Sequence, residues 1–310
     1  MLFSAQGISD LQLYSGLLSS LVFGVVVMVV GWLAVGSRRR HFQIWALWMI
    51  VNSYFLLNPM PGYEFTAFGY FKFAAIAGSV GLIALTRYPI FGKDNSWINP
   101  VTAVRMGMQF NILQAVHSEL ELGRSSWPNA LAGFLLVLMS IPFKGNEANI
   151  IVPKQAQDWD KDSQPSAQFL LSHHWLILYS VWNQTFLLST VPDCWINSTL
   201  HNWLPIMMVF EKNDSLANYC LYRTLALSVT LTNLASQYHA PWINMVNWIF
   251  TWDDRFNWPM DQKHELLHER QALAMGTVTL IITGIWLVRS MYLWYVSEEH
   301  TATGGTKKAA

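Results

Sequence analysis

The chain has 310 residues, of which 53% are hydrophobic and 12% are charged, whereas a soluble domain carries about 25% charged residues. The 19 basic and 19 acidic side chains cancel, so the chain lacks the positive field that a nucleic-acid-binding protein needs. Two cysteines cannot form a disulfide framework. Composition therefore excludes an ordinary cytosolic enzyme, a disordered chain, a disulfide scaffold and a nucleic-acid partner, and it predicts a membrane protein that contacts lipid.

Apolar stretches of about 20 residues, long enough to cross about 30 Å of hydrocarbon, recur along the chain. In chain order they are residues 11–37, 41–63, 65–86, 101–122, 127–143, 167–191, 195–210, 215–236 and 271–296. The stretch 195–210 is short for a span, and 241–252 predicts a half-helix or an interfacial helix. The fold class predicted is all-α: a polytopic transmembrane helical bundle of about eight to nine spans. Residues 1–300 form its single membrane-embedded domain, and residues 301–310 form a polar tail.

The basic residues of the loops predict the orientation. Arg38, Arg39 and Arg40 follow the first span directly, and placing them in the cytoplasm also places most of the other loop lysines and arginines there. This arrangement puts the N-terminus outside and the C-terminus inside. Because outer membranes use β-barrels rather than helical bundles, the predicted location is a bacterial inner membrane.

The fourth span, residues 101–122, carries an unusual number of polar side chains. Asn111, Gln114, His117 and Glu121 recur at steps of three or four residues and so lie along one helix face, with Glu119 beside them. A charge in the middle of a bilayer costs on the order of 3 kcal/mol. We therefore expect this face to line a cavity or to pack on polar partners.

Candidate partners lie in the sixth and eighth spans. Trp182 and Asn183 belong to the sixth, and Arg223 lies roughly 12 Å deep in the eighth, at 1.5 Å per residue. The sequence thus predicts a protein that binds or transports a small polar or anionic molecule between the fourth, sixth and eighth spans. In this hypothesis Arg223 contacts the anion, while side-chain amides supply hydrogen bonds. The alternative is that the polar side chains only join helices to one another.

One motif resembles a metal site in pattern. His264, Glu265 and His268 form an HExxH string, which on a helix places two imidazoles on one face beside a carboxylate and so binds zinc in metalloproteases. The charged neighbours Lys263 and Arg270 fit an exposed helix start equally well. Zinc at His264 and His268 is therefore the one cofactor that the sequence suggests, and the cofactor is otherwise unknown.

Two further functions stay open at this point. The first is an intramembrane enzyme acting on a lipid or an isoprenoid, with His117, Glu119 and Glu121 as acid and base groups or with zinc at the HExxH string. The second is a structural or assembly subunit, whose polar face contacts a second copy or a larger membrane complex. No catalytic residue is assigned. Replacing Arg223 with leucine distinguishes a ligand site from an internal ion pair.

Overall fold

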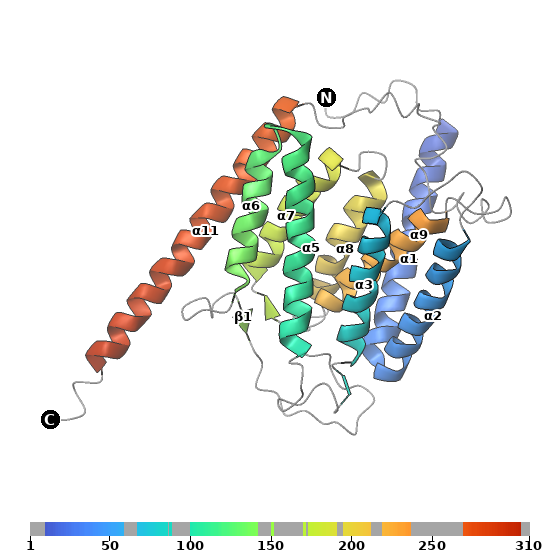
Figure 1. Ribbon diagram of the computed structural model, residues 1–310, viewed down its shortest axis with the longest axis horizontal. Coiled ribbons are helices and arrows are strands. Elements are labelled where there is room, and N and C mark those ends of the chain that lie inside the picture. The colour runs from blue at the N-terminus through green and yellow to red at the C-terminus, as the bar shows by residue number, and fades with distance from the viewer. Residues whose placement is uncertain are drawn as a thin grey trace.

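The protein is described by a computed structural model, which covers residues 10–58, 67–85, 87–88, 100–141, 150–151, 170–171, 173–190, 195–211, 219–236 and 269–304. This part of the chain is all-α, as predicted: nine helices lie side by side, and α11 slants along the outside of the bundle (Figure 1). The helices are α1 (Asp10–Gly36), α2 (Arg38–Leu57), α3 (Ala67–Leu85), α5 (Pro100–Leu122), α6 (Trp127–Met139), α7 (His173–Thr190), α8 (Trp195–Glu211), α9 (Tyr219–Ser236) and α11 (Glu269–Gly304).

The helices follow the predicted apolar stretches closely, with two clear corrections. The last helix, α11, continues past residue 296 to Gly304 and so includes residues 301–304 of the predicted polar tail. The stretch 167–191 begins its helix only at His173, because β2 (Leu170–Leu171) pairs antiparallel with β1 (Ile150–Ile151). The two-residue strands engage backbone groups that a longer helix would need for its own hydrogen bonds. The stretch 241–252 lies outside the described residues.

A row of aromatic side chains on α7 forms the centre of the core. Trp175, Tyr179, Trp182 and Phe186 follow one helix face, with ring centroids 5.2, 5.7 and 6.0 Å apart in turn. The indole nitrogens of the two tryptophans donate to carbonyl oxygens of α6, at 3.0 and 2.9 Å. A buried indole N–H needs such a partner, so this row fixes α7 against α6.

The junction of α1 and α2 depends on a distant arginine. Arg87 is buried and donates to the backbone oxygens of Ala34 and Val35, at the C-terminal end of α1. A cation at this end of a helix satisfies terminal carbonyls and complements the helix dipole. Ser37 then caps α2, because its side chain accepts from the backbone N–H of Arg40 at 3.1 Å.

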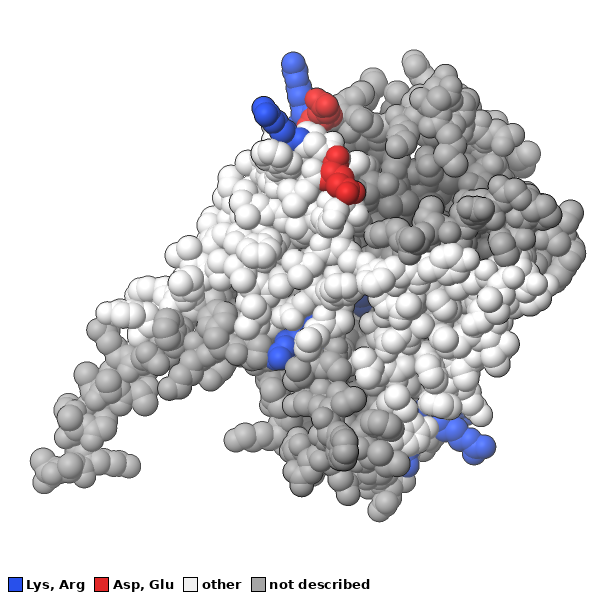
Figure 2. Space-filling view, in the orientation of Figure 1, with Lys and Arg blue, Asp and Glu red and all other residues white. Residues whose placement is uncertain are grey.

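The outer surface of the bundle is strongly apolar. Leu47, Ile50, Ile285 and Val288 each expose more than half of their surface. In the space-filling view most of the described surface is uncharged, with charged side chains at the top and bottom of the view and a few basic ones near its middle (Figure 2). Within the described residues, one stretch, Glu269–Leu293 of α11, is both long and apolar enough to cross a membrane. The other predicted spans therefore stay predictions.

Candidate functional site

A partly enclosed cavity of about 60 Å³ lies between α3, α5, α7 and α9. Small residues create the space: Ala75 and Ser79 on α3 face Gly107 on α5, where a Cβ atom would lie 3.4 Å from the Ser79 hydroxyl oxygen. Trp175 and Tyr179 of the aromatic row close the opposite wall. Since one buried water occupies about 15 Å³ by this measure, the cavity has room for about four waters or for one very small ligand.

Arg223, on the second turn of α9, is the one cation in the cavity wall. Only 7% of its surface is exposed. One terminal nitrogen donates to the backbone oxygen of His201 at 3.1 Å, and the other lies 3.4 Å from the hydroxyl oxygen of Tyr179. The guanidinium carbon also lies 5.7 Å from the centroid of the Tyr179 ring. The remaining nitrogen, Nε, has no hydrogen-bond partner.

No carboxylate in the described part of the chain forms an ion pair with Arg223. A carbonyl dipole and an aromatic ring offset part of the cost of burying the charge. Neither neutralises it, and leaving a buried cation without a counter-charge is expensive. The charge of Arg223 is thus left without a counter-charge among the described residues.

Further polar groups face the same space. Asn111 of α5 lines the cavity opposite α9, as does Thr224, the residue after Arg223. The Thr224 hydroxyl donates to the Cys220 backbone oxygen at 2.8 Å, which leaves its oxygen available only as an acceptor. The side-chain amide of Asn111 and the hydroxyl of Tyr219 are the two groups of this wall that can donate a hydrogen bond besides Arg223.

Of the residues singled out in the sequence, Asn111 and Arg223 both line the cavity, whereas Trp182 and Glu119 lie in a separate cluster. There the Asn129 side chain of α6 donates to a carboxylate oxygen of Glu119 and, at 3.2 Å, to the Trp182 backbone oxygen. Glu119 is fully buried. These three residues join the last turn of α5 and the first turn of α6 to the middle of α7, and they do not line the Arg223 cavity.

Asn183 does not line the Arg223 cavity either, and its side chain contacts α8. Its amide nitrogen donates to the Asn202 side chain of α8 at 3.0 Å, and Asn202 donates in turn to the Ser180 backbone oxygen at 2.8 Å. Gln184 extends this network, because its side-chain oxygen accepts from the Trp203 indole at 3.0 Å. Asn183 therefore joins α7 to α8, the role that the sequence analysis left open as an alternative to ligand binding.

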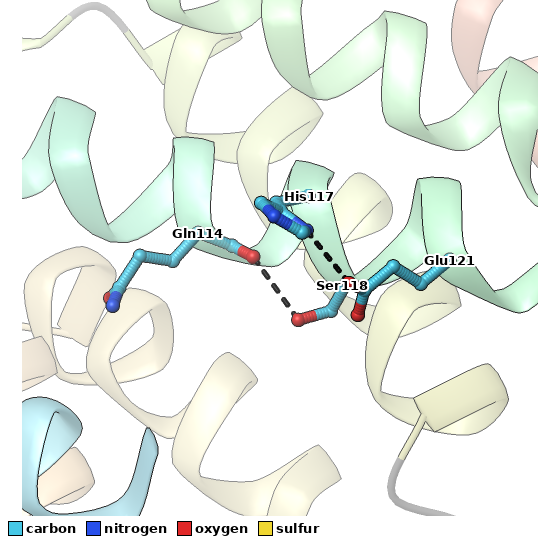
Figure 3. A network of polar contacts seen from close by, with 4 residues as sticks. All are labelled: Gln114, His117, Ser118 and Glu121. Atoms are coloured by element: carbon cyan, nitrogen blue, oxygen red, sulfur yellow. Dashed lines mark hydrogen bonds and ion pairs between the residues drawn. The ribbon is translucent and has the colours of Figure 1, made fainter. Parts of the chain in front are cut away.

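The predicted polar face of α5 does not stay inside the bundle along its whole length. The side chains of His117 and Glu121 are 73% and 71% exposed and lie 3.5 Å apart as an i, i+4 pair (Figure 3). Nearby, the Ser118 hydroxyl donates to the Gln114 backbone oxygen at 3.2 Å. The expectation that this whole face is internal is wrong for its last two turns, because α5 ends at Leu122 and its final residues are exposed there.

The predicted zinc site cannot be placed, since His264 and His268 lie outside the described residues. Within the part of the chain that is described, no group of three or more His, Cys, Asp or Glu side chains could hold a metal ion.

Sequence reasoning missed Tyr179 and the α3 wall of the cavity. A signal for the wall existed in the small residues Ala74, Ala75, Ala77, Gly78 and Ser79, since small side chains let membrane helices approach closely. Tyr179 gave no comparable signal, because its contact with Arg223 depends on how α7 and α9 are rotated.

Comparisons with known proteins add no relative: no family model matches the chain, and neither does any curated protein or solved structure.

Proposed function

We propose that the chain is an integral membrane protein that binds, and in a membrane transports, a small anion in the cavity between α5, α7 and α9. Arg223 is the anion partner and Asn111 the hydrogen-bond donor. The proposal places the protein in a bacterial inner membrane, with the N-terminus outside and the C-terminus inside, as a polytopic helical bundle.

The distribution of polar and apolar side chains supports the membrane part of this proposal. Soluble monomers rarely expose contiguous apolar patches larger than a few hundred Å², whereas Leu47, Ile50 and Val288 belong to a large set of exposed apolar side chains on α2, α11 and other helices. Buried positions are conversely rich in polar groups, including Asn52, Asn129 and other side-chain amides. Lipid is the surrounding that tolerates such an exterior.

The observation that carries the functional part is the buried cation itself. Arg223 reaches a cavity, keeps one nitrogen unbonded and has no carboxylate partner in the described residues. A purely structural arginine would be expected to pair all its donors with protein groups, as Arg87 does more nearly at the end of α1. An anion completes the coordination of Arg223 and supplies the missing charge.

The size of the cavity narrows the ligand class. Room for about four waters fits a monovalent anion of about four non-hydrogen atoms, such as nitrate or acetate, in a space of about 60 Å³. Larger metabolites need cavities of about 300 Å³ or more. The apolar walls, which include Ile76 and Ile83, disfavour multiply charged ions because only one cation lies in the cavity wall.

The proposal is tested by titrating the purified chain in lipid nanodiscs with sodium nitrate and sodium acetate at constant ionic strength. Tryptophan fluorescence reports binding, since Trp175 lines the cavity. Acetamide, which has the shape of acetate without its charge, is expected to bind at least about tenfold more weakly. A charged hydrogen bond contributes about 1.5–3 kcal/mol, or roughly ten- to a hundredfold in affinity.

Matched variants locate the site. Arg223→Gln is expected to weaken acetate binding by about tenfold or more, and Asn111→Ala by about fivefold. Arg289→Gln serves as the control, because that guanidinium lies over the Trp286 ring on α11, at 4.4 Å, and outside the cavity. Unchanged binding by Arg223→Gln, or no binding of any anion by the parent chain, would contradict the proposal. Loss of folding in Arg223→Gln while Asn111→Ala still binds normally would make Arg223 structural.

A further inference from the structure

A second, larger space lies on the other side of α3 and α9. This groove has a volume of about 260 Å³ and is bounded by α1, α2, α3 and α9. It shares no lining residue with the Arg223 cavity. Leu47, which is 62% exposed, stands at its edge and shows that the groove opens at the outer surface of the bundle.

The groove is lined almost entirely by apolar side chains and contains no charged residue. Aliphatic walls come from α1, α2, α3 and α9, and two tryptophans, Trp45 and Trp48, close one side. An ionised ligand would find no counter-charge there, and its desolvation would go uncompensated. The occupant therefore has to be neutral over the part that enters the groove.

One polar cluster interrupts the apolar wall. The Trp48 indole nitrogen donates to the Thr232 hydroxyl oxygen at 2.9 Å and to the Ser228 backbone oxygen at 3.0 Å. The Asn52 amide nitrogen donates to the Trp48 backbone oxygen at 2.9 Å and to the Thr232 hydroxyl at 3.0 Å. Thr232 gives its own proton to the Ser228 backbone oxygen at 2.9 Å.

These contacts fix which way the Asn52 amide points. Both hydrogens of its nitrogen are used, one toward a carbonyl and one toward a hydroxyl whose proton is already committed. Reversing the amide would set the Asn52 oxygen against the Trp48 carbonyl, so that two acceptors would face each other. The oxygen, Oδ1, is therefore held as an acceptor, yet it is fully buried and has no donor. Buried polar atoms of this kind normally have a partner.

We propose that the groove binds a long-chain alcohol, of the fatty or isoprenoid type, whose hydroxyl donates to Oδ1 of Asn52. The apolar chain then lies along Val51, Val80 and Leu225 toward the opening at Leu47. This site is separate from the anion site, and binding of the alcohol does not require Arg223.

The experiment uses the full-length chain in nanodiscs and a diazirine-bearing sixteen-carbon alcohol as the photo-crosslinking probe. Crosslinks are expected on peptides of α2 and α9. Excess 1-dodecanol is expected to compete with the probe about fivefold better than dodecyl methyl ether, which has the same chain but cannot donate a hydrogen bond; this is the affinity ratio of one neutral hydrogen bond. Equal competition by the two compounds would overturn the proposal, and so would labelling elsewhere in the chain.

Two variants add a test on the protein side. Asn52→Leu is expected to bind the alcohol no better than the ether, and Val51→Phe to fill the groove and abolish labelling. Val25→Phe is the matched control, since Val25 is exposed on α1 and does not line the groove. Arg223→Gln is expected to label normally. If Val51→Phe instead disrupts a dimer, while the parent chain shows no alcohol labelling, a second copy occupies the groove and the proposal fails.

Discussion

Glu119 shows how strongly a single polar side chain is constrained inside this bundle. It is fully buried, one of its oxygens accepts from Asn129, and no described cation forms an ion pair with it. Asn129 and Trp182 then bond each other reciprocally, through side chain and backbone in both directions. A negative charge within this cluster is costly, whereas a neutral acceptor of the same shape is not.

This difference leads to a stability prediction. Glu119→Gln is expected to leave the free energy of unfolding unchanged or to raise it, because glutamine keeps the acceptor oxygen and removes the charge. Glu119→Leu is expected to lower it by about 1–3 kcal/mol, since an Asn129 donor loses its partner. Denaturant unfolding of the purified chain measures both. Glu121→Gln, on the exposed side of α5, is the control and should change stability by no more than about 0.5 kcal/mol. A large loss in Glu119→Gln would show that the ionised form is required.

At the scale of the element, the packing of α11 against α6 requires the two helix backbones to lie close together at Gly276. Gly276 faces the first turn of α6, where a Cβ atom would lie 2.9 Å from the backbone nitrogen of Asn129. That backbone cannot move freely, because the same residue is bonded to Glu119 and Trp182. Gly284, two turns further along α11, has nothing within 4 Å of its Cβ position.

Replacing each of these two glycines with alanine is therefore expected to change the stability of the fold in opposite directions. Gly276→Ala is expected to destabilise the fold by about 1–3 kcal/mol, since the added methyl group forces α11 away from α6. Gly284→Ala is expected to stabilise it by up to about 1 kcal/mol, because alanine is the better helix former. Unfolding midpoints of the two variants, compared with the parent chain, measure the effect. Equal midpoints would mean that α11 does not pack on α6 as described.

The positions of the helices along the chain could be predicted from the sequence, but the rotation of each helix about its axis could not. The helices were predictable because each apolar stretch ends at charged or helix-breaking residues, such as Arg38 after α1. Asn111 and Arg223, which line the same cavity, could be singled out because both interrupt apolar stretches. The rotation of each helix was not predictable: Trp182 and Asn183 are adjacent in sequence but bond to different helices, α6 and α8, and no periodic pattern distinguishes those two faces.

At the scale of the whole molecule, charged side chains are few on the described surface: acidic and basic ones lie together at the top of the view, and basic ones lie at the bottom and near the middle (Figure 2). Arg38 and Arg87 lie close together at one end, since the Arg38 guanidinium donates to the Arg87 backbone oxygen at 3.4 Å. Arg124 belongs to the turn that joins α5 to α6 and contains Gly123, whose φ is 110°. Which of these two ends faces the cytoplasm stays a prediction from the loop charges.

The proposed membrane topology makes a prediction that depends on counting crossings. Arg40 lies in the first turn of α2, so that three described helices, α2, α3 and α5, separate it from Arg124. An odd number of crossings puts these two positions on opposite sides of a membrane. In a chain whose two native cysteines are changed to alanine, Arg124→Cys is expected to react with an impermeant maleimide added to intact cells, and Arg40→Cys to react only after lysis.

The unfolding temperature of the cysteine-free chain checks that it still folds. Reaction of both cysteines from the same side would exclude three crossings, and reaction in the reverse order would keep the bundle but invert its orientation. An untagged chain that remains in the soluble fraction of lysed cells would exclude the membrane assignment altogether, and the apolar surface of α2 and α11 would then have to be covered by protein.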